Sequence, residues 1–460
     1  MRKLTYSILS LVAVLLLAAC DPGKDAFSID HTRPVSDANR IIYQLNVGAF
    51  TPEGTFKAAE GQLARLDTLG IDILWLMPIY PRGETMHSPY ASMNFYDVNP
   101  AYGTVGDLKS FVAAAHEHGM KVWLDWVPNH VAVENPWVTE HPEYFTKDNK
   151  GQMIHPHGWG DVYELNYQDK GLVSKMSGAM KFWVDSCDVD GFRCDYVSSP
   201  TIPVSYWQNI IAEMKSKNGK AIEFLSETDI TNPENNRIDS CGFDYDYAWD
   251  LQGMLAWKFK DSSDADSLKN ILDTFLAASR QVKNRRMVYL TNHDQNYNDG
   301  GHTLKDFYGD NRYALTVLEF TFYGMPLLYQ GQEIGDPDTL NYFTDAKVKW
   351  QQADRKMQHL VRTLCALHHT QPSLAADAPV EFVSVSEPTV LAYRRGPVLV
   401  LLNLGTSPCS VSSKGIDAGT YTQWLNSQTI TEGPSTTDVT LDAKAPISLE
   451  GKGFAVFVKQ

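Results

Sequence analysis

Four short segments place polar, mostly ionisable side chains directly after apolar runs that read as buried strands. They are DWVPNH (125–130), GFRCD (191–195), LSE (225–227) and TNHD (291–294). In a parallel barrel the carboxyl ends of all strands converge on one pocket, whatever their separation in the sequence. The carboxylates Asp195, Glu227 and Asp294 would then share this pocket with neighbouring His and Arg side chains. Such a group could supply the nucleophile and the general acid/base that glycoside hydrolysis requires.

Strand-like and helix-like segments alternate throughout the part of the chain that carries these residues. The strand candidates are residues 41–47, 71–79, 121–127, 189–197, 221–228, 243–251, 287–294 and 325–333. Amphipathic stretches such as 56–70 and 107–119 lie between them and end at glycines, as helices do. The sixth strand candidate is short of β-branched residues. This alternation predicts an α/β fold, a (β/α)8 TIM barrel over residues 40–372.

The alternation is broken at two places, which divide the chain. After His130 a stretch rich in His, Pro, Trp and Gly predicts an inserted segment, residues 131–170, that follows the third strand. From residue 376 onward, short apolar runs are separated by turn residues with no helix between them. Residues 376–460 are therefore predicted to form a C-terminal antiparallel β-sandwich.

The N-terminus predicts a lipoprotein signal peptide over residues 1–19. A basic start and an apolar stretch (8–17) precede the tetrapeptide LAAC, which ends at Cys20. LAAC resembles the bacterial lipobox, in which the Cys is lipidated after cleavage; ordinary secretory cleavage is the alternative. The apolar stretch is too short to span a membrane, and the polar residues 20–39 are typical of a tether. We therefore expect a protein of the bacterial cell envelope, held to a membrane only by its lipid anchor.

Composition and charge narrow the possible partners. The chain is 43% hydrophobic and 21% charged, with a formal net charge of −15. This acidic balance argues against a nucleic-acid partner, for which a basic surface is expected, and it suits a neutral substrate. The six cysteines show no CxxC or metal-type spacing, so we predict no disulfide framework.

Taken in order, the motifs resemble those of glycoside hydrolase family 13, the α-amylase family. DWVPNH, GFRCD, SET and TNHD are similar to the first to fourth family regions, and GIDILWLMPI, ELNYQD and GMPLLYQGQE are similar to its accessory motifs. The resemblance covers residues 40–370. It implies that Asp195 is the nucleophile that forms a covalent glycosyl-enzyme and that Glu227 is the acid/base. It also implies that Asp294 stabilises the transition state through the sugar 2- and 3-hydroxyls.

Further residues are expected to support this chemistry. Arg193 lies two residues before Asp195 on the same strand face, so it should hydrogen-bond Asp195 and keep it ionised. By the resemblance, His130 and His293 contact sugar hydroxyls, and Tyr90 stacks beneath the reacting glucose. Asp125 has a structural role in this interpretation, orienting its neighbours.

The sequence departs from the family pattern after the nucleophile. Many members carry Lys-His where this chain has Ser198-Ser199, which puts the leaving-group contacts and a structural calcium in question. Asn129 could still ligate calcium, but the short inserted segment lacks an obvious Asp-rich partner. We expect no cofactor and do not favour a calcium site.

The motifs together predict a retaining hydrolase of α-1,4-glucosidic bonds in starch or malto-oligosaccharides. A transglycosylase, or a hydrolase of α-1,6, sucrose or trehalose linkages, would use the same machinery and is the first alternative. A non-catalytic sugar-binding lipoprotein is the second, and it predicts loss of Asp195, Glu227 or Asp294, all of which are present. Carboxyl groups about 5–5.5 Å apart would give retention, and about 6.5–9.5 Å inversion.

Overall fold

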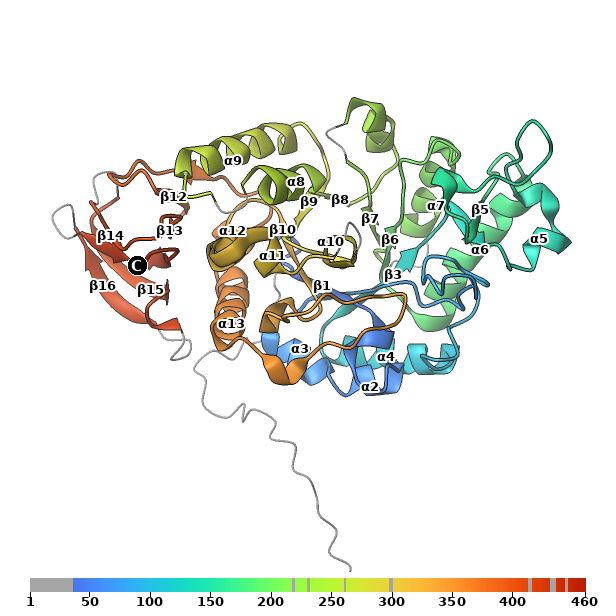
Figure 1. The fold of residues 1–460 in the computed structure, drawn as a ribbon, viewed down its shortest axis with the longest axis horizontal. Coiled ribbons are helices and arrows are strands. Elements are labelled where there is room, and N and C mark those ends of the chain that lie inside the picture. Colours follow the sequence, from blue (N-terminus) through green and yellow to red (C-terminus); the bar gives the residue numbers. More distant parts are fainter. Residues whose placement is uncertain are drawn as a thin grey trace, which may run out of the picture.

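A closed barrel of parallel strands lies between an inserted segment at one end of the molecule and antiparallel sheets at the other (Figure 1). The computed structural model describes residues 36–216, 220–229, 232–259, 262–297, 301–412, 416–430, 436–442 and 446–460. The predicted signal peptide, Cys20 and most of the predicted tether lie outside these residues.

Eight strands of the described chain close the barrel, as the alternation predicted. In chain order they are β1 (Ile42–Leu45), β2 (Ile73–Leu76), β3 (Lys121–Trp126), β6 (Gly191–Cys194), β7 (Glu223–Ser226), β8 (Tyr245–Tyr247), β9 (Arg285–Val288) and β10 (Met325–Tyr329). All neighbours are parallel, and β10 pairs with β1 to complete the ring. The polar segments that follow β3, β6, β7 and β9 therefore open onto one face.

Helices in the connections surround the barrel. They are α1 (Val47–Phe50), α2 (Phe56–Glu60), α3 (Leu63–Leu69), α4 (Val105–Glu117), α6 (Lys170–Cys187), α7 (Val204–Ser216), α8 (Trp249–Lys258), α9 (Ala265–Ser279), α10 (His293–Tyr297), α11 (Leu304–Tyr308), α12 (Arg312–Thr321) and α13 (Arg355–Thr370). Side-chain oxygens of Asp169, Asp264 and Asp354 cap α6, α9 and α13 by accepting hydrogen bonds from first-turn N–H groups. Along α9, Leu268, Leu272 and Phe275 recur at helical spacing and are buried against the barrel.

The interior of the barrel is filled by large side chains. Trp75, Trp123, Tyr245 and Met287 belong to one buried cluster inside the ring of strands. Gly191 makes room for them, because a Cβ at this position would lie 2.5 Å from the Glu223 carbonyl oxygen and 2.6 Å from the Trp123 ring. The glycine of GFRCD thus has a packing role, and the barrel is a filled core with its chemistry confined to one face.

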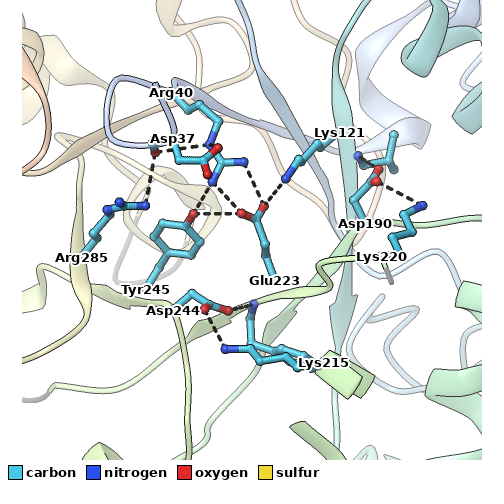
Figure 2. Close-up of polar contacts among 12 residues, drawn as sticks. Asp37, Arg40, Lys121, Asp190, Lys215, Lys220, Glu223, Asp244, Tyr245 and Arg285 are labelled. Carbon is cyan, nitrogen blue, oxygen red and sulfur yellow. Dashed lines mark hydrogen bonds and ion pairs between the residues drawn. The ribbon is translucent and has the colours of Figure 1, made fainter. Parts of the chain in front are cut away.

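Buried ion pairs close the opposite, N-terminal end of the barrel (Figure 2). The guanidinium of Arg40 donates to both carboxylate oxygens of Glu223, at 2.6 and 3.1 Å, and Arg40 is only 5% exposed. The Tyr245 hydroxyl donates to Glu223 at 3.2 Å, and Lys121 Nζ lies 3.3 Å from its other oxygen. Since Glu223, Tyr245 and Lys121 begin their strands, the network ties three strand starts to the residues that precede β1.

The inserted segment forms a small subdomain beside the C-terminal end of β3. Strand β4 (His130–Ala132) pairs antiparallel with β5 (Val162–Glu164), and α5 (Trp137–Glu140) lies in the excursion between them. The Leu165 N–H donates to the Asn129 carbonyl at 3.0 Å and extends this pairing toward the barrel. The pairing therefore brings the chain back to the C-terminal end of the barrel after residues 133–161.

The C-terminal region consists of antiparallel sheets, as predicted. A six-stranded sheet has the order β11 (Glu381–Phe382), β12 (Val390–Arg395), β13 (Val398–Asn403), β18 (Phe454–Lys459), β15 (Gly419–Asn426) and β16 (Thr437–Leu441). A second pair, β14 (Cys409–Val411) and β17 (Ile447–Leu449), packs on it through a shared apolar cluster. In Figure 1 these strands lie beside α9, α12 and α13.

Several predicted elements were too long. The first strand ends at Leu45 because Asn46 accepts a hydrogen bond from the Gly48 N–H at 3.0 Å and starts α1 instead. The predicted sixth strand, 243–251, is reduced to Tyr245–Tyr247, and α8 begins at Trp249. The helix predicted over 56–70 is divided in two at Gly61, as expected of a residue that weakens helices.

Candidate active site

A cleft of about 1080 Å³ at the C-terminal end of the barrel collects the residues predicted from the four segments. Its lining includes Tyr90, His130, Asp195, Glu227, His293 and Asp294. The remaining predicted residue, Arg193, has no exposed surface and contacts Asp195 and Glu227 of the lining. Residues separated by up to two hundred positions in the sequence therefore meet in one place.

The backbone fixes Asp195 and Glu227 at the ends of neighbouring strands. The Asp195 N–H donates to the Trp126 carbonyl at 2.8 Å, and the Glu227 N–H donates to the Cys194 carbonyl at 3.0 Å. These bonds continue the parallel pairing of β3, β6 and β7 by one residue beyond each strand. Both carboxylates therefore project from ordered backbone rather than from the tip of a loop.

Arg193 joins three carboxylates beneath the cleft. Its Nη1 donates to Asp125 Oδ1 at 2.9 Å and to Asp195 Oδ1 at 2.8 Å, and its Nη2 lies 2.7 Å from Glu227 Oε1. The guanidinium also lies over the Trp75 ring, 5.1 Å from its centroid. A cation held between anions and an aromatic face is rigid, so it fixes the carboxyl groups relative to one another.

Burial controls the protonation of both carboxyls at the cleft floor. It raises the pKa of Glu227 to about 8, with Arg193 opposing the shift and Asp195 adding to it. Burial also raises the pKa of Asp195 to about 6, again against the pull of Arg193. Arg193 was expected to keep Asp195 ionised. It does lower the pKa of that carboxyl, but burial outweighs it and the net shift is upward. Because the pKa of Glu227 is raised further than that of Asp195, Glu227 is the better proton donor of the two and Asp195 the better anion.

A hydrogen-bonded chain orders the other side of the cleft. Gln44 Oε1 accepts a hydrogen bond from the backbone N–H of His293 at 3.3 Å. This leaves Gln44 Nε2 to donate to the ring atom Nδ1 of His293 at 2.7 Å. The proton of this imidazole is therefore on Nε2, 2.6 Å from the Tyr90 hydroxyl, and that hydroxyl lies 3.1 Å from Asp125 Oδ2. The Tyr90 and His293 rings stack at 5.3 Å. This chain fixes the position of Tyr90 in the lining of the cleft.

Burial keeps both cleft histidines neutral. It lowers the pKa of His130 and of His293 to about 4, so neither carries a charge at neutral pH. Neutral imidazoles can exchange hydrogen bonds with sugar hydroxyls without adding charge to the pocket. Asp294, in the first turn of α10, places its side chain 3.5 Å from His293 Nε2 and also lines the cleft.

Comparison with known proteins agrees with this geometry. The family description "Alpha amylase, catalytic domain" matches residues 35–164 and 148–368. The chain belongs to the alpha-amylase family. The matched region contains the whole barrel and the inserted segment, so its catalytic part is a glycosidase domain of the α-amylase type.

Individual relatives place the chain within this alpha-amylase family. It is 27% identical to alpha-amylase MalA of Haloarcula japonica over 84% of its own length, and it spans 58% of that relative. It is also 27% identical to a malto-oligosyltrehalose trehalohydrolase of Saccharolobus solfataricus, covering 66% of this chain and 58% of that one. A solved maltogenic alpha-amylase, AmyB of Thermotoga neapolitana, superposes with a TM-score of 0.75 at 27% identity, covering 92% of this chain and 99% of that chain.

Three residues of this alpha-amylase-family site were not found by sequence reasoning. The Tyr247 hydroxyl accepts a hydrogen bond from Arg193 Nε at 2.9 Å, Trp75 Nε1 donates to Asp125 Oδ2 at 3.1 Å, and Gln44 sets the His293 tautomer. Each lies inside a barrel strand, where the sequence alone predicts a side chain that only packs in the core. Only Gln44 gave a signal, as a polar residue within an otherwise apolar first strand.

Asn129, which the sequence left open as a calcium ligand, lies beside His130 in the described part of the chain. Its side-chain oxygen is buried without a hydrogen-bond partner, and its amide nitrogen lies 3.2 Å from His130 Nδ1. No group of three His, Cys, Asp or Glu side chains among the described residues could hold a metal ion.

Proposed function

We propose that the protein is a retaining glycosidase that cleaves α-1,4-glucosidic bonds in starch or malto-oligosaccharides. The observation that carries this proposal is the arrangement of Asp195 and Glu227 on one guanidinium, with the pKa of Glu227 raised further than that of Asp195. Retaining enzymes hold their two carboxyl groups closer together than inverting enzymes, which need a wider gap for water. Binding of both carboxyls to a single guanidinium favours the closer spacing. Family membership and the alpha-amylase relatives support an α-glucan as substrate.

Two steps follow from these positions. Asp195 attacks the anomeric carbon while Glu227 gives its proton to the departing oxygen, so the glycosidic bond breaks and a glycosyl ester forms. Glu227, now a carboxylate, takes a proton from water, which attacks the same carbon and releases Asp195. The pKa of about 8 suits Glu227 to both roles, since it holds a proton at pH 7 and yields it readily.

The surrounding residues would bind the reacting sugar. We assign Asp294 to the 2- and 3-hydroxyls, His130 and His293 to further hydroxyls, and Tyr90 to the face of the ring. Each of these side chains lines the same cleft as the two carboxyls. Hydrogen bonds that strengthen as the ring flattens would lower the barrier.

A different linkage or acceptor is the second candidate. A relative of equal identity is a malto-oligosyltrehalose trehalohydrolase, which favours a hydrolase of other α-linked substrates or a transglycosylase built on the same machinery. The catalytic residues would keep their roles in these reactions, and only the contacts beyond the reacting sugar would differ.

The cellular site is proposed from the N-terminus. We propose that residues 1–19 are removed, that Cys20 is lipidated, and that residues 20–39 tether the catalytic part (residues 40–372) and the C-terminal part (376–460) to the bacterial cell envelope. Within the described residues, no helix has the length and apolar character needed to cross a membrane.

Proton NMR of maltohexaose mixed with purified residues 21–460 tests the function directly. New α-anomeric signals within the first minutes, before mutarotation, are the expected result; first appearance of the β-anomer would contradict retention. Asp195→Asn and Glu227→Gln serve as matched controls that preserve shape, and both should leave maltohexaose intact. If the wild type also leaves it intact, sucrose, trehalose and isomaltose distinguish another linkage from a protein that only binds sugar.

A further inference from the structure

Exposed apolar side chains lie on the rim of the cleft, beyond the residues assigned to the reacting sugar. In the described part of the chain, the large hydrophobic side chains that remain exposed are Met86 (52%), Trp159 (45%) and Trp257 (66%). Met86 and Trp159 line the cleft, and Trp257 does not. An indole exposed in this cleft can stack on the apolar face of a sugar ring, which makes Trp159 a candidate for substrate contact.

Trp159 is connected to the catalytic residues through two side chains. The His157 ring lies 4.8 Å from the Trp159 ring, and His157 Nε2 lies 2.9 Å from the Tyr196 hydroxyl. Tyr196 directly follows Asp195, and its backbone N–H donates to Glu227 Oε2 at 2.8 Å. The His157–Trp159–Tyr196 cluster therefore joins the inserted segment to the end of β6, and Trp159 and Tyr196 both line the cleft.

The backbone of this cluster is unusual. His157 has a φ of 53° and Tyr196 a φ of 42°, in the left-handed region that non-glycine residues seldom occupy. The two strained residues are bonded to each other through their side chains. Strain retained beside a catalytic centre supports a functional role for the position of these rings.

The side of the scissile bond to which the cluster belongs depends on Glu227, because the Trp159 ring also lies 5.5 Å from the ring of His130, a residue assigned to the reacting sugar. Tyr90 and Asp294 both contact His293, and all three are assigned to the sugar that forms the covalent intermediate. Glu227, which must face the departing oxygen, instead accepts a hydrogen bond from the backbone N–H of Tyr196, which places this residue of the cluster directly beside the acid. Whatever stacks on Tyr196 and Trp159 would thus belong to the part of the substrate that departs first.

The two serines that follow the nucleophile, Ser198 and Ser199, offer few contacts to a leaving group. Ser198 and Ser199 replace the Lys-His pair that contacts the leaving group in many family members. Ser199 is buried and its hydroxyl lies 2.9 Å from that of Thr201, while both serine carbonyls accept hydrogen bonds from Arg237. Of the two, only Ser198, with its short side chain, lines the cleft. Larger side chains have to supply the contacts here.

We propose that Trp159 and Tyr196 form the platform that binds the leaving glucosyl units of the α-glucan, with His157 holding the two rings in place. The inference rests on the proposed glycosidase function and names the side chains that bind its leaving group. The same platform would receive a sugar acceptor in place of water, so it would also govern how much transglycosylation accompanies hydrolysis.

Two substrates that differ only on the leaving-group side provide the test. Maltohexaose needs bound leaving glucosyl units, whereas α-maltotriosyl fluoride releases a fluoride ion that cannot contact an aromatic platform. For Trp159→Ala, the ratio of kcat/KM on maltohexaose to kcat/KM on the fluoride should fall about tenfold or more, consistent with about 1.4 kcal/mol of lost stacking. Trp257→Ala is the matched control, because it removes an exposed indole outside the cleft.

The outcomes distinguish failure of the Trp159–Tyr196 platform from failure of the glycosidase function on which it rests. A Trp159→Ala ratio equal to that of Trp257→Ala overturns the platform, and an equal fall on both substrates places Trp159 on the other side of the scissile bond, which also overturns it. A wild type that acts on neither substrate counts against the glycosidase function itself. Tyr196→Phe removes only the hydroxyl that meets His157, so a smaller fall of the same ratio is expected if His157 holds the rings.

Discussion

Arg193 Nη2 lies 2.7 Å from Glu227 Oε1, yet the pKa of Glu227 is raised rather than lowered. An adjacent cation alone would favour the ionised carboxylate. Burial opposes this effect and prevails, because Arg193 is shared with Asp125 and Asp195 and its charge is already largely matched. The guanidinium therefore positions Glu227 without causing it to lose its proton, and Glu227 must keep this proton to act as a donor at neutral pH.

Activity should show a bell-shaped pH dependence. Below about pH 6 Asp195 becomes protonated and loses its nucleophilicity; above about pH 8 Glu227 loses the proton that it must donate. We expect kcat/KM on maltohexaose to be highest between these values. A profile measured from pH 4 to 10 checks this, and a rate that is constant from pH 5 to 9 would contradict the assignment. With α-maltotriosyl fluoride, which needs no acid, the alkaline decline should weaken.

Glu227→Gln should separate the two substrates. Loss of the acid leaves the departing sugar oxygen without a proton, so hydrolysis of maltohexaose should fall by about 10²–10⁴-fold. Fluoride leaves unaided, and formation of the glycosyl-enzyme from α-maltotriosyl fluoride should continue. Rapid-quench measurement of fluoride release with the Glu227→Gln variant would detect a burst. Asp195→Asn is the control, for which no burst is expected on either substrate.

Glu227→Gln should also make the protein more stable at alkaline pH. The folded-state pKa of about 8 lies above the ordinary glutamate value of 4.5, so the folded state holds this proton more tightly than the unfolded chain. Ionisation of Glu227 therefore costs stability progressively from pH 4.5 to 8, and the whole penalty is present above pH 8. The Glu227→Gln variant has no ionisable group here, so it does not incur this loss of stability.

The measurement is a comparison of Tm by scanning calorimetry at pH 9 and at pH 4. Glu227→Gln should raise Tm by about 2–5 °C at pH 9 and leave it nearly unchanged at pH 4. An equal decrease at both values would mean that lost packing, not relief of a buried charge, dominates the variant.

Loss of the Tyr90 hydroxyl should lower kcat/KM on maltohexaose less than loss of the whole ring. Tyr90→Phe keeps the stacking face and loses the bonds to His293 and Asp125, so a decrease of about tenfold in kcat/KM is expected. Tyr90→Ala also removes the ring, and the decrease should reach about 10³-fold. Steady-state kinetics on maltohexaose compares them. Equal losses would show that Tyr90 acts through its hydroxyl alone.

The ion pair at the far end of the barrel should affect stability and spare catalysis. Glu223→Ala leaves Arg40 buried without its bidentate partner, at an expected cost of about 3–5 kcal/mol in the free energy of unfolding. Asp273→Ala, which breaks an exposed pair with Lys269, should cost less than about 1 kcal/mol. Urea unfolding measures both. If Glu223→Ala lowered kcat/KM of the folded protein, the two ends of the barrel would be coupled.

Much of the fold was readable from local pattern. Alternating strands and helices gave the barrel, and the short runs after residue 376 gave the antiparallel sheets, because hydrophobic periodicity reports which face of an element is buried. The polar residues after β3, β6, β7 and β9 could be placed in one pocket without coordinates, since parallel strands share one C-terminal face. Element ends were less predictable, as Asn46 and Trp249 illustrate, because they depend on local hydrogen bonds.

By itself, the sequence determined the barrel, the convergence of Asp195, Glu227 and Asp294, and the family to which their motifs belong. Only the tertiary structure decided that one guanidinium would hold both carboxyls, that Tyr247 would hold that guanidinium, and that His157 would join Trp159 to Tyr196. The physical reason is that protonation depends on burial from every side and stacking depends on the approach of distant segments. Neither is encoded in the spacing of residues along one element.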